Sequence, residues 1–324
     1  MRAFTCDTCS EHVYFDNTVC ITCGSDLAWS RAEQRIVVLD EAGGRCGNLG
    51  LNGCNWLPEE PGGLCSSCLL TRTRPDDDDL VGLPQYYVAE QAKRRLVAEL
   101  DVLRLPVVPR DPETGKGVAF DLLSSVRADV VTGHADGVVT IDLAEGDDVH
   151  RERVRVEMGE AYRTMLGHLR HEIGHYYEMV LVDDEETAEE ARALFGDERA
   201  DYQAALDKHY ADGPPDSWAE SYVSAYATMH PFEDFAETFA HVLHVRDGLE
   251  TAHAFGLIVD PAVGVRSFAD VVIGTWLPLT RALNQMNRSM GQSDLYPFVV
   301  SPPVVDKLDF VHGLVTGAQE EEAW

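Results

Sequence analysis

The chain has 324 residues, 45% of them hydrophobic, so it can form one large or two ordinary domains with a packed core, and disorder throughout is excluded. Its 26 Lys and Arg stand against 56 Asp and Glu, and the formal net charge of −30 argues against binding to nucleic acid or to an anionic membrane. The first residues contain no apolar run typical of a signal peptide, and no segment offers about eighteen uninterrupted apolar residues, so we expect a cytoplasmic protein without a membrane partner.

All eight cysteines lie in the first 68 residues. They divide into two quartets that can each supply the four thiolates of a closed zinc site: Cys6, Cys9, Cys20 and Cys23, then Cys46, Cys54, Cys65 and Cys68. We expect this sequential pairing because neighbouring Cys-x-x-Cys pairs close shorter loops. So short a segment buries little apolar surface, and residues 1–72 are therefore predicted to be a zinc-ribbon module that folds around two structural Zn2+ ions. Disulfides and a redox role are the weaker alternatives in a reducing cytosol.

The aromatic and basic residues of this module favour a structural role. Its arginines are scattered rather than clustered, which argues against a nucleic-acid partner. Trp29 and Trp56 are expected to pack on the zinc loops rather than to contact a partner.

A solvated linker is predicted at residues 73–80, where Pro75 precedes the acidic run Asp76–Asp79, and a second domain is predicted at 81–324. Apolar residues at helical spacing between Val88 and Leu105 predict an amphipathic helix. The β-branched run from Gly137 to Leu143 predicts a strand. This strand either forms a sheet edge that pairs with an extended peptide substrate, or serves only as part of a sheet.

Residues 148–182 are predicted to be helical, in two pieces that meet near Gly159. The second piece contains a His-Glu-x-x-His pattern, in which His171 and His175 stand one turn apart on one face and can bind one zinc ion. Glu172 lies beside them as a candidate general base for a water activated by the metal. A polar stripe along this helix indicates a buried site: Thr164, His168, His171, His175 and Glu178.

A catalytic zinc site needs a third protein ligand. A third His at the metzincin spacing is missing, since Glu178 and Leu181 occupy those positions. A later helix is predicted from Pro231, a residue suited to a first helical turn. Four possible ligands share one face of it: Glu233, Glu237, His241 and His244. The two glutamates are the stronger candidates.

The remaining C-terminal segment is predicted to be helical as well. We expect one or two helices from Phe268 to Met290 with a bend near Trp276 and Pro278, a helix from Val304 to Val315, and a frayed tail from Gln319 to Trp324.

The two predicted site helices resemble those of the gluzincin metallopeptidases, whose third ligand is a downstream Glu. Glu233-Asp234-Phe235-Ala236-Glu237 is similar to their pattern. The resemblance implies that Glu233 is the third ligand and that Glu237 accepts the free N–H of a ligand His, with Glu237 as ligand the alternative. Tyr226 matches the position of a catalytic Tyr in some gluzincins, which implies a donor for the oxyanion; Tyr222 and a plain packing role are the alternatives.

A wider resemblance extends over nearly the whole chain. The cysteine quartets, the strand, residues 167–177, Glu233–Glu237 and a C-terminal Leu295-Tyr296-Pro297-Phe298 are together similar to a bacterial family of zinc-binding metallopeptidases with an N-terminal zinc ribbon. The family resemblance implies an α+β, zincin-like and mainly helical peptidase domain with a small sheet, preceded by the zinc-ribbon module. It also implies one catalytic Zn2+ in addition to the two structural ions.

The resulting hypothesis is a zinc-dependent peptidase that hydrolyses a peptide or protein substrate, with Glu172 as general base. The alternative is a non-catalytic, zinc-dependent protein-binding or regulatory protein that uses a peptidase fold.

Overall fold

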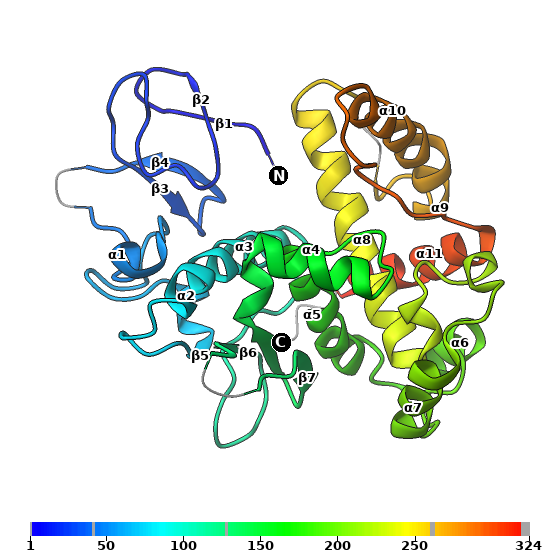
Figure 1. The fold of residues 1–324 in the computed structure, drawn as a ribbon. Helices are drawn as coiled ribbons and strands as arrows, with labels where there is room; N and C mark the ends of the chain where they lie inside the picture. The colour runs from blue at the N-terminus through cyan, green and yellow to red at the C-terminus, as the bar shows by residue number, and fades with distance from the viewer. Residues whose placement is uncertain (1, 41–42, 127–128, 260–262, 319–324) are drawn as a thin grey trace. The chain divides into compact units, whose positions relative to one another are not determined.

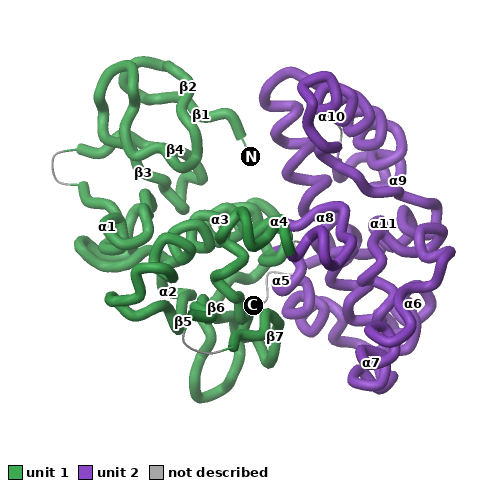
Figure 2. The backbone as a smooth tube through the Cα atoms, viewed as in Figure 1, with its two compact units in different colours: residues 1–153, 164–169 green, residues 154–163, 170–324 purple. Residues whose placement is uncertain are grey.

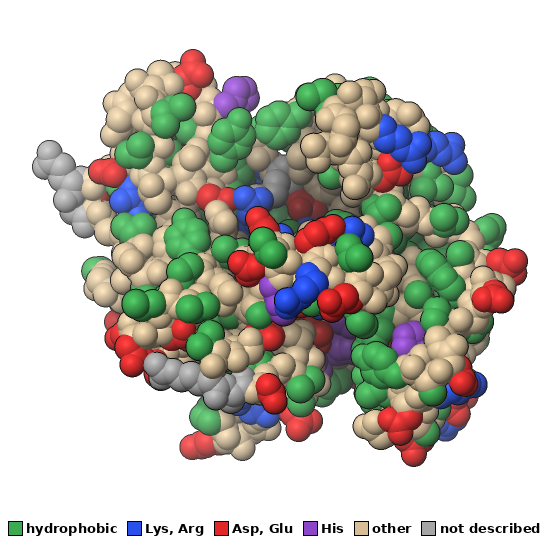
Figure 3. Space-filling view, viewed as in Figure 1, with side chains coloured by type: hydrophobic (Ala, Val, Ile, Leu, Met, Phe, Trp, Pro, Cys, Tyr) green, Lys and Arg blue, Asp and Glu red, His purple; other side chains and the backbone are tan. Residues whose placement is uncertain are grey.

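The computed structural model describes residues 2–40, 43–126, 129–259 and 263–318, so the expected tail from Gln319 lies outside the described residues. The chain forms two compact units, residues 1–153 with 164–169 and residues 154–163 with 170–324 (Figure 2). Helices predominate and the sheets are small (Figure 1). The predicted fold class, a mainly helical α and β chain behind a cysteine-rich N-terminal region, is confirmed. On the face drawn in Figure 3, acidic side chains are scattered over each unit.

The N-terminal region of the first unit is built from short hairpins. Strands β1 (Phe4–Thr5) and β2 (His12–Val13) pair antiparallel, as do β3 (Leu27–Ser30) and β4 (Arg35–Val38). Two one-turn helices follow, α1 (Leu49–Asn52) and α2 (Ser66–Leu69). Trp29 and Trp56 are buried, and their ring centroids lie 6.1 Å apart, so both have a packing role rather than an exposed contact role.

A four-stranded sheet completes the first unit, in the order β5 (Thr71–Thr73), β6 (Ala119–Leu123), β8 (Val138–Asp142), β7 (Gly133–Ala135). The strand predicted at 137–143 is present as β8; of the two alternatives, a sheet edge is wrong and membership of a sheet holds. Strand β8 is parallel to β6 on one side and antiparallel to β7 on the other. The β7–β8 hairpin turns through Asp136 and Gly137, whose φ angles of 47° and 76° match the turn that an Asp-Gly pair favours.

Helix α3 (Gly82–Val102) corresponds to the amphipathic helix predicted from Val88, but begins six residues earlier. Asp79, expected in a solvated linker, is buried, and its Oδ1 accepts hydrogen bonds from the amides of Val81 and Gly82 at 3.2 and 2.7 Å. The carboxylate thus satisfies free N–H groups at the start of the helix. Helix α3 packs against the 3-10 turn η1 (Leu143–Gly146).

The predicted break near Gly159 separates α4 (Asp148–Glu157) from α5 (Met165–Leu181), and Gly159 has a φ of 67°. The second unit then contains α6 (Glu185–Phe195), α7 (Tyr202–Asp212), the 3-10 turns η2 (Trp218–Glu220) and η3 (Tyr226–Thr228), and α8 (Pro231–Ala254). Asp184 and Asp201 cap α6 and α7 through hydrogen bonds from backbone amides.

The C-terminal helices of the second unit are α9 (Phe268–Val271), the π-helical segment η4 (Val272–Trp276), α10 (Leu277–Ser289) and α11 (Pro302–Gly317). The predicted bend near Trp276 is this π-helical segment, which leads directly into α10. Helix α11 packs along α8, the longest helix of the described chain. No helix among the described residues combines the length and apolar character that crossing a membrane requires.

Candidate functional site

Helix α5 carries the His-Glu-x-x-His pattern, and the side chains of His171 and His175 meet on one of its faces. Their ring centroids lie 5.0 Å apart with the planes nearly perpendicular. The i, i+4 spacing on a helix produces this proximity. Both imidazoles can therefore present a nitrogen to one ion.

Helix α8 supplies a carboxylate to both histidines from its first turn. Glu233 Oε2 lies 2.9 Å from His171 Nε2 and 3.5 Å from His175 Nε2. One ligand atom from each of the three residues lies within 4.8 Å of the other two. Pro231 sets the first turn, and His230 accepts the amide hydrogen of Phe232 on its Nδ1. The start of α8, and with it Glu233, is thus fixed locally by sequence.

Glu237 takes a different position, one helical turn further along α8. Its Oε1 lies 2.7 Å from His171 Nδ1, the ring nitrogen that faces away from Glu233. His171 is therefore bracketed by two carboxylates, one on each ring nitrogen. A histidine whose Nδ1–H is donated to a carboxylate has its Nε2 lone pair available for a metal ion.

Gly174, the residue before His175, allows α5 and α8 to approach closely. A Cβ added at Gly174 would lie 3.0 Å from Ala236 Cα and 3.1 Å from its carbonyl oxygen. Ala236 lies between Glu233 and Glu237 on α8. The glycine therefore brings the two carboxylates within reach of His171.

Charge at the site favours a cation between these side chains. Burial lowers the pKa of His171, but the hydrogen bonds to Glu233 and Glu237 outweigh burial and raise the pKa well above its usual range. Burial raises the pKa of Glu233, yet the hydrogen bonds to His171 and His175 hold it well below its usual range. In the chain alone, a proton on His171 balances the carboxylates. A dication with nitrogen and oxygen ligands can take its place, and this donor set fits Zn2+.

Glu172 is buried beside this cluster. Its Oε2 is buried without a hydrogen-bond partner among the described residues. Burial raises the pKa of Glu172 against the opposing charges of His171 and His175. A buried acceptor without a partner implies a water or ligand in the space that it faces.

Two tyrosines from elements upstream of α8 border the cluster. Tyr202, at the start of α7, donates its hydroxyl to Glu233 Oε1 at 2.8 Å, and no sequence argument identified it. Tyr226, in η3, has its ring centroid 6.0 Å from that of His171. Tyr222, the competing candidate, instead lies beneath the ammonium of Lys307, 4.3 Å from its ring centroid.

Three other histidines of the two site helices have contacts outside the cluster. His241 Nδ1 lies 2.7 Å from the hydroxyl of Tyr296, and His244 Nδ1 accepts from Arg170 at 2.7 Å. His168 Nδ1 is 3.7 Å from Glu145. The three-residue cluster does not include them.

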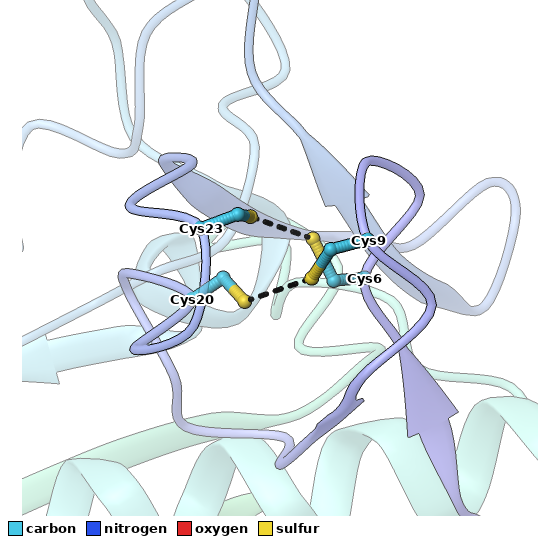
Figure 4. Close-up of side chains that lie close together, drawn as sticks. All are labelled: Cys6, Cys9, Cys20 and Cys23. Atoms are coloured by element: carbon cyan, nitrogen blue, oxygen red, sulfur yellow. Dashed lines mark hydrogen bonds between the residues drawn. The ribbon is translucent and has the colours of Figure 1, made fainter.

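The first cysteine quartet forms a second possible metal site (Figure 4). The Sγ atoms of Cys6 and Cys23 lie 3.6 Å apart, as do those of Cys9 and Cys20. These distances are too long for a disulfide, and a tetrahedron with Zn–S bonds of ~2.3 Å has edges of about 3.8 Å. Cys23 is exposed at the surface of this quartet.

The second quartet, from Cys46 to Cys68, is buried in the first unit. Its Sγ atoms accept hydrogen bonds from backbone amides: Cys65 N to Cys46 at 3.3 Å and Cys68 N to Cys65 at 3.4 Å. The sequential pairing predicted for the eight cysteines is the grouping in the structure.

Buried polar and charged side chains lie beside Cys68 of this second quartet, most of them from α3. Asn52 Nδ2 lies 3.8 Å from Cys68 Sγ and 3.2 Å from Glu90, and Lys93 donates to Glu90 at 2.6 Å. Glu90, Lys93 and the adjacent Arg94 are all buried. Lys93 and Arg94 together outweigh the carboxylate of Glu90 by one positive charge, and Lys93 favours the thiolate form of Cys68.

Comparisons with known proteins agree with this arrangement. Residues 82–314 match a family model described as "Putative zinc-binding metallo-peptidase", and residues 3–79 match one described as "zinc-ribbon domain". Uncharacterized proteins of Mycobacterium tuberculosis strain H37Rv and of Mycobacterium bovis are each 51% identical over 97% of this chain and 95% of their own length. No solved structure matches the chain.

Proposed function

Because the chain belongs to the family of zinc-binding metallopeptidases and carries an N-terminal zinc ribbon, we propose that it is a zinc-dependent peptidase whose catalytic ion is held by His171, His175 and Glu233. The observation that carries this proposal is the cluster of their three ligand atoms within 4.8 Å. Its immediate neighbour is a buried glutamate without a partner, Glu172. A gluzincin type of site follows from the third ligand being a downstream Glu.

Zinc at this position would supply a Lewis acid that lowers the pKa of a water molecule and polarises the carbonyl of the scissile peptide bond. The protein prepares the ligands for the ion. Glu237 holds the Nδ1 side of His171 at 2.7 Å, which fixes the tautomer and ring orientation. Tyr202 holds the second oxygen of Glu233 and so limits rotation of that carboxylate.

Glu172 is the proposed general base. It accepts a proton from the attacking water and returns it to the leaving amine, so the water oxygen forms the new bond to the carbonyl carbon as the C–N bond breaks. Burial, which raises the pKa of Glu172, makes the carboxylate a stronger base than an exposed glutamate. Tyr226 is the proposed donor to the oxyanion that develops on the carbonyl oxygen.

The two cysteine quartets are proposed to hold two structural Zn2+ ions, which gives three ions per chain. Closed sites of four thiolates leave no position for a substrate. Reduced cysteines in such sites persist in a reducing compartment, and the cytoplasm is the proposed location.

The experiment compares Glu172→Gln with the unchanged protein. The variant is expected to keep three zinc ions per chain and to lose hydrolysis of an unstructured protein substrate by a factor of about 10³, because only the proton acceptor is removed. Glu189→Gln, an exposed residue of α6, is the matched control and removes the same charge. Equal hydrolysis by Glu172→Gln refutes the role of Glu172. Full zinc content without hydrolysis by the unchanged protein favours instead a zinc-dependent binding protein.

A further inference from the structure

A pocket of about 290 Å³ lies in the second unit, between the end of α5, helix α6 and the start of α8. It adjoins the proposed zinc ligands along the chain. Glu178 lines it one turn after His175, and Phe232 lines it immediately before Glu233. The volume is near the lower end of the range for small-molecule sites, which suits a single side chain.

The walls of the pocket are largely apolar. Val182, Ala191, Phe195 and Phe232 contribute to them. Such walls accommodate the methylene stem of a long side chain. The polar end of the guest would be recognised by the charged groups of the lining, which are acidic except for Arg192.

Glu178 and the exposed Asp183 are the charged groups of the lining without a partner among the described residues, and Glu178 is the less exposed of the two. No hydrogen bond or ion pair joins its carboxylate to any residue that the structure describes, apart from those at its backbone. Burial, and then the neighbouring charges of Glu198 and Glu233, raise the pKa of Glu178 to about 9. A cation in the pocket would relieve this cost and favour the ionised form.

Arg192 is the cationic side chain of the pocket lining, and its charge is already paired with two carboxylates. It donates to Glu198 through Nε and Nη2 at 3.0 and 2.9 Å, and to Glu185 through Nη1 at 2.7 Å. An acidic guest would therefore find no free cation there. Asp183 and Asp184 add further negative charge to the lining.

We propose that this pocket receives a lysine or arginine side chain of the peptide substrate, with Glu178 as the residue that pairs with the cationic head. The inference rests on the proposed peptidase function and names the substrate class of the same site. The apolar walls then pack against the aliphatic stem of the guest, and the carboxylate of Glu178 pairs with its cationic head.

The test is a binding measurement that does not depend on hydrolysis. The full-length, zinc-loaded Glu172→Gln protein is titrated with pairs of fluorescent peptides. The two peptides of a pair differ at one position, which is lysine in one and norleucine in the other, and this position moves along the peptide from pair to pair. Norleucine keeps the four-carbon stem of lysine and lacks the ammonium group. At one position, the lysine peptide is expected to bind about tenfold more tightly. Adding Glu178→Gln is expected to reduce that ratio to about one, whereas adding Glu190→Gln, an exposed acid on α6, leaves it in place.

Circular dichroism and zinc content establish that each variant is folded, and Glu178→Ala repeats the test with the carboxylate removed altogether. Equal affinity for both peptides at every position overturns the proposal, as does a lysine preference that survives both Glu178 substitutions. Loss of the preference in both variants supports it. A Glu178-dependent preference combined with no hydrolysis by the protein with Glu172 intact overturns the peptidase function while the pocket assignment stands.

Discussion

Replacing Gly174 by alanine tests whether the close approach of α5 and α8 builds the metal site. Alanine is the better helix former by about 1 kcal/mol, so an unobstructed substitution would stabilise the protein. At Gly174, however, the new Cβ would lie 3.0 Å from Ala236 Cα and 3.1 Å from its oxygen. Both atoms belong to the backbone of α8, so they cannot rotate away, and overpacking of this kind costs about 1–3 kcal/mol.

The same contact should also weaken metal binding at the His171, His175 and Glu233 site. Relief of the contact requires α8 to move by a few tenths of an ångström, and α8 carries Glu233, whose Oε2 now lies 2.9 Å from His171 Nε2. Zinc–ligand distances tolerate only about 0.2 Å. We therefore expect the Gly174→Ala protein to bind the proposed catalytic ion about tenfold or more weakly. Its affinity for the ions proposed at the two cysteine quartets should be unchanged.

The measurement is the zinc content of the full chain after equilibration with a graded series of chelator concentrations, together with urea unfolding of the chelated protein. Gly313→Ala is the matched control, since that glycine lies within α11 and its Cβ would meet nothing within 4 Å. The control should gain about 1 kcal/mol and keep its zinc affinity. If Gly174→Ala gains stability like the control and holds its third ion equally well, the reasoning is refuted.

Two further predictions concern buried charge in the second unit. Lys307→Met removes the partner that donates to Asp234 at 2.6 Å, leaves a buried carboxylate unpaired, and should lower the free energy of urea unfolding by about 3–5 kcal/mol. Adding Asp234→Asn should restore much of that loss; a loss below about 1 kcal/mol for Lys307→Met contradicts the prediction. Burial, with the charge of Arg246, lowers the pKa of His312 from 6.5 to about 4. As the pH falls, the unfolded chain therefore takes up a proton on this residue before the folded chain does. The free energy of unfolding should fall between pH 6.5 and 4, by up to about 3 kcal/mol. Urea unfolding of His312→Gln across this window should show a shallower pH dependence than the unchanged protein, and parallel curves would contradict the assignment.

Features encoded by local spacing could be predicted from the sequence. The i, i+4 pair of histidines and each Cys-x-x-Cys pair fix their own geometry within a few residues, and the grouping of the eight cysteines into two sequential quartets is as expected. The helix predicted from Pro231 is present, and Glu233 in its first turn lies 2.9 Å from His171.

Contacts made between elements could not be predicted in the same way. Tyr202 reaches Glu233 from another helix, 31 residues away, and no motif marks it. Gly174 belongs to the segment that carries the family resemblance, but the sequence does not show that an added Cβ would meet the backbone of α8 at Ala236. The position of β8 within its sheet depends on β7, a three-residue strand without a β-branched run; the Asp136-Gly137 pair was the available signal for that hairpin.

The buried second quartet has a consequence for where the chain can be divided. Its thiolates and the side chains of Glu90, Lys93 and Arg94 share one interior, and Lys93 also donates to Thr71 across the predicted linker. If the chain were cut near residue 72, the second cysteine quartet would be exposed on one fragment, and the three buried charged side chains of α3 would be exposed on the other. If the second quartet holds the proposed Zn2+, we expect uptake of the ion and formation of α3 to be coupled, because the ligands and the buried charges of α3 share this interior.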